Sequence, residues 1–206
     1  MAGVNEVPGR DVITGLIIAG GRAQRMGGVD KGLQLLVGRP LLAQVIERFA
    51  PQADRLLLNV NHHAAAYASF GLMRVADLTP DYAGPLAGLQ AGLTCCTTPI
   101  LACVPCDTPF LPLDLVPRLH AALLAHDAEL AVATVAGRAQ PAFMLCRRTV
   151  LPGLTDFLQR GGRRIGEWQQ QCRSVEVAFD DEAAFINFNH LEELREYATH
   201  PFQKTP

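Results

Sequence analysis

"LIIAGGRAQRMGGVDKG", residues 16–32, joins an apolar strand directly to a glycine-rich turn that carries positive charge. The continuous apolar run predicts a strand covered on both faces, as strands of parallel sheets are. Glycines directly after such a strand expose backbone N–H groups and let a ligand approach the main chain. Arg22, Arg25 and Lys31 add donors suited to phosphate oxygens. The segment therefore favours a phosphate-binding loop.

The spacing of the glycines excludes two familiar nucleotide-binding loops. No G-x-x-x-x-G-K-[ST] pattern and no G-x-G-x-x-G pattern can be drawn through the segment. Neither a P-loop NTPase nor a dinucleotide-binding dehydrogenase is therefore supported. A plain tight turn at Gly20 and Gly21 is the alternative interpretation of the same residues.

Apolar strand segments alternate with helical segments along the rest of the chain. Strands are expected at 13–19, 55–60, 72–76, 100–107, 130–135, 142–147 and 174–179, and helices at 40–50, 62–69, 84–94, 113–126, 149–160, 163–171 and 191–198. This alternation is typical of an α/β fold with a mostly parallel central sheet and helices on both faces. Residues 1–206 are expected to form one domain, with loose tails at 1–12 and 200–206.

Composition and charge narrow the class of protein. The chain has 206 residues, of which 49% are hydrophobic, so it can bury a sizeable core. A formal net charge of −2 gives no general attraction to nucleic acid or to an anionic membrane. The N-terminus has no secretory pattern, and no apolar run reaches the roughly 20 residues that span a bilayer. We therefore expect a cytoplasmic protein with neither nucleic acid nor membrane among its partners.

Two of the six cysteines, Cys103 and Cys106, match a C-x-x-C pattern. The sharper interpretation is a redox pair or half of a zinc site. However, this pair closes an apolar run, whereas thioredoxin-like pairs open a helix. We therefore favour a buried strand end with free thiols, as expected for a chain of this size.

Polar side chains follow the predicted strands at the points where these strands end. Asn59 and Asn61 close the second strand, Asp77 the third and Asp107 the fourth. Because ligands bind at the carboxyl ends of parallel strands, these side chains should converge with the glycine-rich loop on one crevice. A carboxylate beside a polyphosphate site suits Mg²⁺, which takes one or two carboxylates together with phosphate oxygens. The alternative role for Asp107 is to stabilise the turn in "DTPFLP".

Several segments together resemble one enzyme family. "IIAGGRAQRMGGVDKGL" is similar to the L-A-G-G-x-x-x-R-M-G-x-x-K signature of nucleotidyltransferases, and its Asp30-Lys31 form resembles the MobA-type molybdenum cofactor guanylyltransferases. Further segments resemble later blocks of that family, namely "LLLNVNHH" (56–63), "VADLTPDYAGPLAGL" (75–89), "CDTPFLP" (106–112), "RAQPAFMLCRR" (138–148), "GGRRIGEW" (161–168) and "FINFNHLEEL" (185–194). The similarity spans about residues 13–195.

The resemblance implies a Rossmann-like nucleotidyltransferase fold and a specific reaction. GTP and molybdopterin, usually already bearing molybdenum, would give the guanine dinucleotide cofactor and pyrophosphate, with Mg²⁺ or Mn²⁺ as cofactor. A terminal phosphate oxygen of the pterin would attack the α-phosphorus of GTP, so no protein nucleophile is needed. The nucleotide-binding residues implied are Ile18, Ala19, Gly20, Gly21, Lys31, Asn59, Asp77 and Asp107. Arg25, Lys31 and Asp107 would be catalytic, and Asp107 would hold the metal.

The acceptor side of the resemblance is less sharply defined. Its candidates are the polar residues Arg138, Gln140, Arg147, Arg163, Arg164, Asn187 and Asn189, because the pterin is anionic and rich in hydrogen-bonding edges. His190-Leu191 departs from the usual Thr-Pro and changes a helix N-cap. Transient contact with proteins that deliver molybdopterin, or with chaperones of molybdoenzymes, is a further expectation. The alternatives are a cytidylyltransferase acting on the same pterin and a non-catalytic nucleotide sensor.

Overall fold

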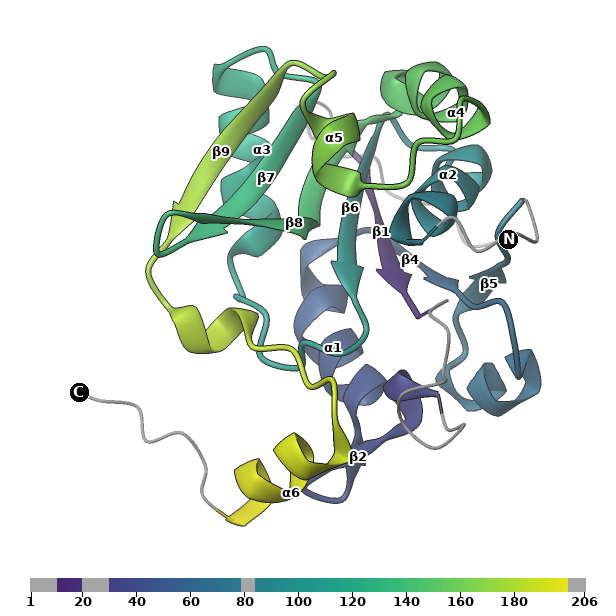
Figure 1. The fold of residues 1–206 in the computed structure, drawn as a ribbon, viewed down its shortest axis with the longest axis vertical. Helices are drawn as coiled ribbons and strands as arrows, with labels where there is room; N and C mark the ends of the chain where they lie inside the picture. Colours follow the sequence, from purple (N-terminus) through teal and green to yellow (C-terminus); the bar gives the residue numbers. More distant parts are fainter. Residues whose placement is uncertain (1–10, 20–29, 79–83, 200–206) are drawn as a thin grey trace.

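The computed structural model describes residues 11–19, 30–78 and 84–199 (Figure 1). Three predicted site residues, Gly20, Gly21 and Arg25, lie outside these ranges, as do residues 1–10 of the expected N-terminal tail and the whole expected C-terminal tail, 200–206. The strand before residues 20–29 and the turn after them are both described.

A seven-stranded sheet forms the centre of the molecule, in the order β5-β4-β1-β6-β8-β7-β9. Its strands are β1 (Ile13–Ile18), β4 (Arg55–Asn59), β5 (Met73–Val75), β6 (Ile100–Pro105), β7 (Leu130–Val135), β8 (Arg138–Arg147) and β9 (Ser174–Phe179). Only β8 runs antiparallel to its neighbours, β6 and β7. The carboxyl ends of all the other strands therefore lie along one edge, toward which their arrows point in Figure 1.

Helices cover both faces of this sheet. One face packs against α1 (Leu41–Phe49) and α3 (Leu115–Ala125), and the other against α2 (Pro85–Cys95), α4 (Leu151–Gln159) and α5 (Ile165–Gln169). Consecutive residues of β1 point to opposite faces, so Leu16 packs in the α2 cluster and Ile17 in the α1 cluster, both fully buried. This two-sided burial explains the unbroken apolar run in β1. None of the described helices is long and apolar enough to cross a membrane.

A smaller apolar cluster ties the C-terminal segment to the same edge of the sheet. It joins the short hairpin β2 (Leu35–Leu36) and β3 (Arg39–Pro40) to α6 (Leu191–Thr199), which lies beside β2 in Figure 1. Phe188 is buried in this cluster and packs edge-on against Phe110. The cluster therefore holds the segment before α6 close to the end of β6.

Most predicted elements are confirmed, and three differences have physical causes. Residues 64–70 form the 3-10 helix η4, not an α-helix, and it starts after a left-handed residue, His63. The strand expected at 142–147 begins earlier, at Arg138. A bulge around Pro141 interrupts the regular pairing of β8, so residues 138–141 show no regular strand pattern in the sequence. The β2–β3 hairpin has strands of two residues each, too short to leave a periodic pattern.

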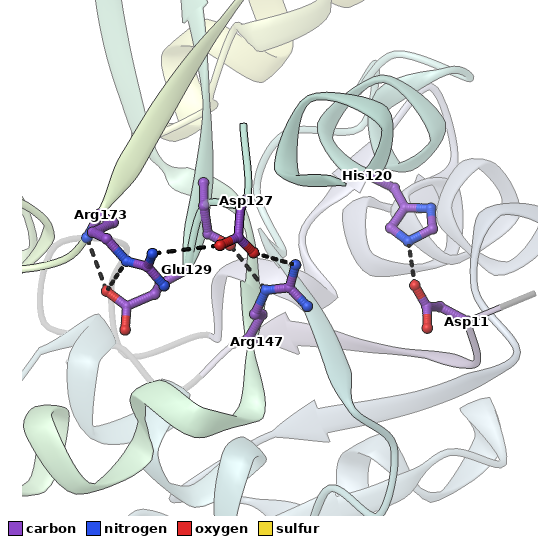
Figure 2. A network of polar contacts seen from close by, with 7 residues as sticks. Asp11, His120, Asp127, Glu129, Arg147 and Arg173 are labelled. Atoms are coloured by element: carbon purple, nitrogen blue, oxygen red, sulfur yellow. Dashed lines mark hydrogen bonds and ion pairs between the residues drawn. The ribbon is translucent and has the colours of Figure 1, made fainter. Parts of the chain in front are cut away.

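Ion pairs connect neighbouring strands at the edge of the sheet opposite the carboxyl ends of the parallel strands (Figure 2). Arg147, at the end of β8, donates to the Ala128 carbonyl at 2.9 Å and lies 3.7 Å from Asp127. Arg173 lies 3.6 Å from the same aspartate, and its main-chain N–H donates to Glu129. Because β8 runs antiparallel, Arg147 lies at the edge away from the strand ends that carry Asn59 and Asp107. This contact set gives it a structural role, in place of the acceptor-binding role considered from the sequence.

The C-x-x-C cysteines lie where the strand interpretation predicts. Cys103 is in β6 and Cys106 directly follows it, and both are buried free thiols. Burial raises the pKa of both thiols well above the ordinary value. Neutral thiols are poor nucleophiles and poor metal ligands, so the structure favours packing as their role.

Candidate functional site

Lys31 joins three segments that are far apart in the sequence. Its Nζ donates to Asp107 Oδ2 at 3.1 Å and to Asn189 Oδ1 at 2.5 Å. The Asp107 side chain is 13% exposed and that of Lys31 30%, so the pair is shielded but open to a ligand from one side. The cluster places one positive charge beside one carboxylate at the carboxyl end of β6.

Local packing fixes both partners of this ion pair. Lys31 begins a single 3-10 turn, η2 (Lys31–Leu33), in which Gly32 is buried against α1 and Cys106. A Cβ at Gly32 would lie 3.4 Å from Leu42 Cβ, so glycine allows the turn to approach this closely. The main chain of Asp107 is held as well, because its carbonyl accepts the N–H of Phe188 at 3.0 Å.

A second polar cluster lies at the ends of β4 and β5. Asn59 Nδ2 and Asn61 Nδ2 each donate to one carboxylate oxygen of Asp77 at 2.8 Å. The Asp77 N–H donates back to Asn61 Oδ1 at 2.9 Å. Gly88 of α2 makes room for this arrangement, since a Cβ there would lie 2.8 Å from Asn59 Cγ. The Asp77 carboxylate is thereby oriented, and its remaining lone pairs can accept from ligand hydroxyl or N–H groups.

The strand order gives the distance between the two clusters. Asn59 ends β4 and Asp107 follows β6, and β1 lies between these strands. Neighbouring strands are about 4.8 Å apart, which puts the two clusters about 10 Å from each other. The described end of β1 lies between them. A nucleotide could therefore place its nucleoside at Asn59 and Asp77 and its phosphates at Lys31 and Asp107.

The sheet already uses part of the main chain at the end of β1. The Ala19 N–H donates to the Asn59 carbonyl at 2.9 Å, and the Ile18 carbonyl accepts the Cys106 N–H at 3.1 Å. Contacts of Ile18 and Ala19 with a nucleotide would thus have to come from their other main-chain atoms. These bonds also hold the end of β1 to both neighbouring strand ends.

Asp30, next to Lys31, makes a contact that the sequence did not suggest. His63 Nδ1 lies 3.2 Å from Asp30 Oδ2, and the Asp30 side chain is only 11% exposed. Burial, with smaller contributions from Cys106 and Asp30, raises the pKa of the Tyr67 phenol, which stays neutral beneath this turn. Asp30 and His63 therefore tie the lysine turn to η4. A histidine pair at the start of a helix gives no signal for this contact.

The acceptor candidates are spread over different parts of the structure. Arg138 is exposed on the β7–β8 hairpin, at the sheet edge formed by the carboxyl ends of the parallel strands (the site edge). Asn187 is exposed on the segment leading to α6. Arg163 donates to the carbonyls of Leu158 in α4 and of Gly162, and Arg164 pairs with Glu167 at 3.0 Å. Within the described residues, neither of these two arginines makes a polar contact with the lysine cluster. Asn189, a candidate for the pterin, contacts Lys31.

Glu193 has a role that no sequence motif indicated. Its Oε2 accepts the N–H groups of Asn189 at 2.6 Å and of His190 at 3.1 Å. It lies at the third position of α6 and reaches back over the helix start, as the acidic member of a capping box does. The sequence signal for this capping box was the glutamate itself, three residues after the cap position, His190. The missing Ser or Thr at His190 concealed it.

We expect Glu193→Ala to free the main chain at Asn189. Two N–H groups lose their acceptor, so the free energy of unfolding should fall by about 1 kcal/mol, and amide hydrogen exchange at Asn189 and His190 should accelerate. Glu193→Gln should restore both properties, because the amide oxygen can still accept. Glu192→Ala, which removes the same charge from the same helical turn, is the matched control. Equal exchange rates in the two alanine variants would contradict the capping role.

The comparisons with known proteins agree with this geometry. A family model described as "MobA-like NTP transferase domain" matches residues 15–174. A molybdenum cofactor guanylyltransferase from Cupriavidus necator is 50% identical over 195 residues, covering 92% of this chain and 98% of the relative. One from Ralstonia nicotianae is 49% identical, covering 90% and 96%.

The fold is also found among solved structures. Molybdopterin-guanine dinucleotide biosynthesis protein A from Archaeoglobus fulgidus superposes with a TM-score of 0.76 at 18% identity, covering 90% of this chain and 97% of that one. At that identity the superposition supports the fold, whereas the curated relatives support the family. The chain therefore belongs to the MobA-like nucleotidyltransferases, in the branch whose curated relatives are named molybdenum cofactor guanylyltransferases.

Proposed function

We propose that this enzyme transfers GMP from GTP to the terminal phosphate of molybdopterin, usually already bearing molybdenum, and releases pyrophosphate. The observation that carries the proposal is the Lys31 and Asp107 pair, 3.1 Å apart beside the end of the glycine-rich loop. The names of the curated relatives support guanylyl as the transferred group. GTP and molybdopterin are then the two substrates.

Within this proposal, catalysis rests on positioning and on charge. An acceptor phosphate oxygen forms a bond to the α-phosphorus of GTP while the bond from that phosphorus to the pyrophosphate oxygen breaks, so no covalent enzyme intermediate is needed. Lys31 holds phosphate oxygens through its ammonium group, and Arg25, outside the described residues, is assigned the same task. Asn59 and Asp77 bind the nucleoside. Such fixed positive groups stabilise charge where it develops in the transition state.

Asp107 is proposed to hold Mg²⁺, with Mn²⁺ as the alternative. Its carboxylate is largely buried, with 13% of the side chain exposed, and the neighbouring Thr108 hydroxyl is buried with no hydrogen-bond partner in the described structure. One carboxylate with room for phosphate and water oxygens suits a hard cation. When bound, the metal would neutralise charge on the α-phosphate and on the leaving pyrophosphate.

Titration calorimetry with GTP, CTP, ATP and UTP, each with and without Mg²⁺, tests the nucleotide assignment. We expect tightest binding for GTP and a gain in affinity on adding Mg²⁺. Tightest binding for CTP would move the assignment to cytidylyl transfer on the same fold. Absence of binding to all four would contradict the proposed nucleotide site. Incubation with GTP, Mg²⁺ and molybdopterin, followed by detection of the dinucleotide, then tests the acceptor.

A further inference from the structure

A hollow of about 350 Å³ lies along the site edge, at the tip of the β7–β8 hairpin. Its lining comes from the hairpin and from the 3-10 helix η6 (Glu182–Phe185), and consists of Val135, Ala136, Arg138, Gln140, Glu182 and Phe185. The bulge around Pro141 shifts the register between β7 and β8 three residue pairs from this tip. The hollow is therefore built by an irregular part of the sheet, next to strand ends that form the candidate site.

The lining combines apolar walls with uncommitted polar groups. Phe185 is 7% exposed and is held edge-on between Phe143 and Phe179, with ring centroids at 5.0 and 5.4 Å. By contrast, the side chains of Arg138, Gln140 and Glu182 make no hydrogen bond or ion pair within the part of the chain that is described. A rigid apolar wall with a few convergent polar groups is typical of a site for a small planar ligand.

One chain segment connects this hollow to the lysine cluster. Phe185 lines the hollow, the N–H of Phe188 donates to the Asp107 carbonyl, and the Asn189 side chain accepts from Lys31. Four residues from Phe185 to Asn189 span at most about 14 Å. The strand order β6-β8-β7 gives a similar separation of about 10 Å between the ends of β6 and β7. The hollow thus lies on the opposite side of Asp107 from the cluster of Asn59, Asn61 and Asp77.

We propose that this hollow holds the fused-ring end of the acceptor, with the acceptor phosphate directed to Lys31 and Asp107. The assignment rests on the function proposed above and locates its second substrate. The 2-amino-4-oxo-pyrimidine edge of a pterin presents adjacent N–H donors that a carboxylate such as Glu182 can accept, and a carbonyl that Arg138 can bind. Gln140 offers both a donor and an acceptor, and Phe185 contributes apolar contact. Nucleoside, phosphates and acceptor ring then follow one another along a single edge.

The experiment measures ring binding and acceptor use separately. Fluorescent 6-hydroxymethylpterin, a ring without phosphate, is titrated into the full chain and into Glu182→Ala, Arg138→Ala and Gln140→Trp. Alanine at Glu182 or Arg138 should weaken probe binding and raise the KM for molybdopterin about tenfold or more, because charged hydrogen bonds are lost. Tryptophan at Gln140 should fill the hollow and abolish probe binding. GTP affinity should stay unchanged in all three.

Two controls match the charge changes. Glu192→Ala and Arg39→Ala remove the same side chains from α6 and β3, and both should bind the probe as the wild type does. GTP affinity also reports folding, so a variant that merely unfolds is recognised by losing both ligands.

The possible results separate this proposal from the function it rests on. The proposal would be overturned if the hollow variants bound the probe and used molybdopterin as well as the wild type does. It would also be overturned if the wild-type chain showed no saturable binding of the probe. A fall in GTP affinity with unchanged acceptor KM would reassign the hollow to guanine, which has the same pyrimidine edge, and would also overturn it. If the wild type transfers no GMP to molybdopterin yet binds the probe through the hollow, the proposed function fails while the pterin site stands.

Discussion

Asp107→Ala is expected to reduce guanylyl transfer by at least about 10³-fold while leaving the fold intact. The variant loses the carboxylate proposed to hold the metal, and removal of one preorganised charge-stabilising group typically costs 10²–10³-fold or more in kcat. Asp107→Asn keeps the shape of the side chain and removes only its charge. It should lose nearly as much activity, because the charge is what holds the metal in this proposal. Steady-state formation of the dinucleotide from GTP and molybdopterin measures the loss.

Stability should change little in the same variant. The main-chain bond from Phe188 to the Asp107 carbonyl remains, and Lys31 keeps Asn189 as a partner. A partly exposed ion pair contributes up to about 1 kcal/mol, so the free energy of unfolding should fall by no more than that. Asp114→Ala, at an exposed ion pair with Arg118, is the control for a lost surface carboxylate. A variant that unfolds, but is active once refolded, would instead show that Asp107 only stabilises its turn.

Mn²⁺ binding in the presence of GTP gives a second readout for Asp107. Paramagnetic relaxation of water protons reports the bound ion without any turnover. We expect the wild type with GTP to bind Mn²⁺ more tightly than the alanine variant with GTP. Equal Mn²⁺ affinities would remove Asp107 from the proposed metal site, even if the variant were inactive.

The central sheet could be predicted because its strands are buried on both faces. Leu16 and Ile17 pack on opposite helical layers, so β1 leaves an unbroken apolar run, and β6 does the same. The rule that parallel strands deliver ligand-binding groups at their carboxyl ends then located Asn59, Asp77 and Asp107. The structure brings these residues to one edge, although within the described residues no hydrogen bond or ion pair links the cluster of Asn59, Asn61 and Asp77 to the Lys31 and Asp107 pair.

Contacts between distant segments could not be predicted in the same way. Lys31 and Asn189 are 158 positions apart and meet where Phe188 packs into the small cluster with the β2–β3 hairpin. No periodic pattern encodes that docking. The hollow was missed for a related reason: Gln140 and Glu182 become neighbours through the bulge in β8 and the turn after β9, and neither feature has a regular sequence signature.

Lys31→Ala is expected to lower kcat/KM for GTP by about 10²-fold and to weaken GTP binding. The ammonium group is proposed to contact phosphate oxygens, and removing one such donor typically costs at least that factor. Lys31→Arg should restore only part of the activity, since a planar guanidinium cannot take the place of a compact ammonium between Asp107 and Asn189. Arg39→Ala, which removes an exposed positive charge paired with Glu47, should leave GTP binding unchanged.

The composition of the chain offers a direct view of this lysine. Lys31 and Lys204 are the two lysines in the sequence, so ¹³Cε labelling gives two signals that Lys31→Arg assigns. In the free protein Nζ contacts Asp107 and Asn189, and a bound phosphate would replace at least part of this environment. The Lys31 signal should therefore move on addition of GTP with Mg²⁺, and should move less with GMP, which lacks the β- and γ-phosphates. A signal that stays in place at saturating GTP would separate Lys31 from the phosphates and leave it as a structural link between β6 and the C-terminal segment.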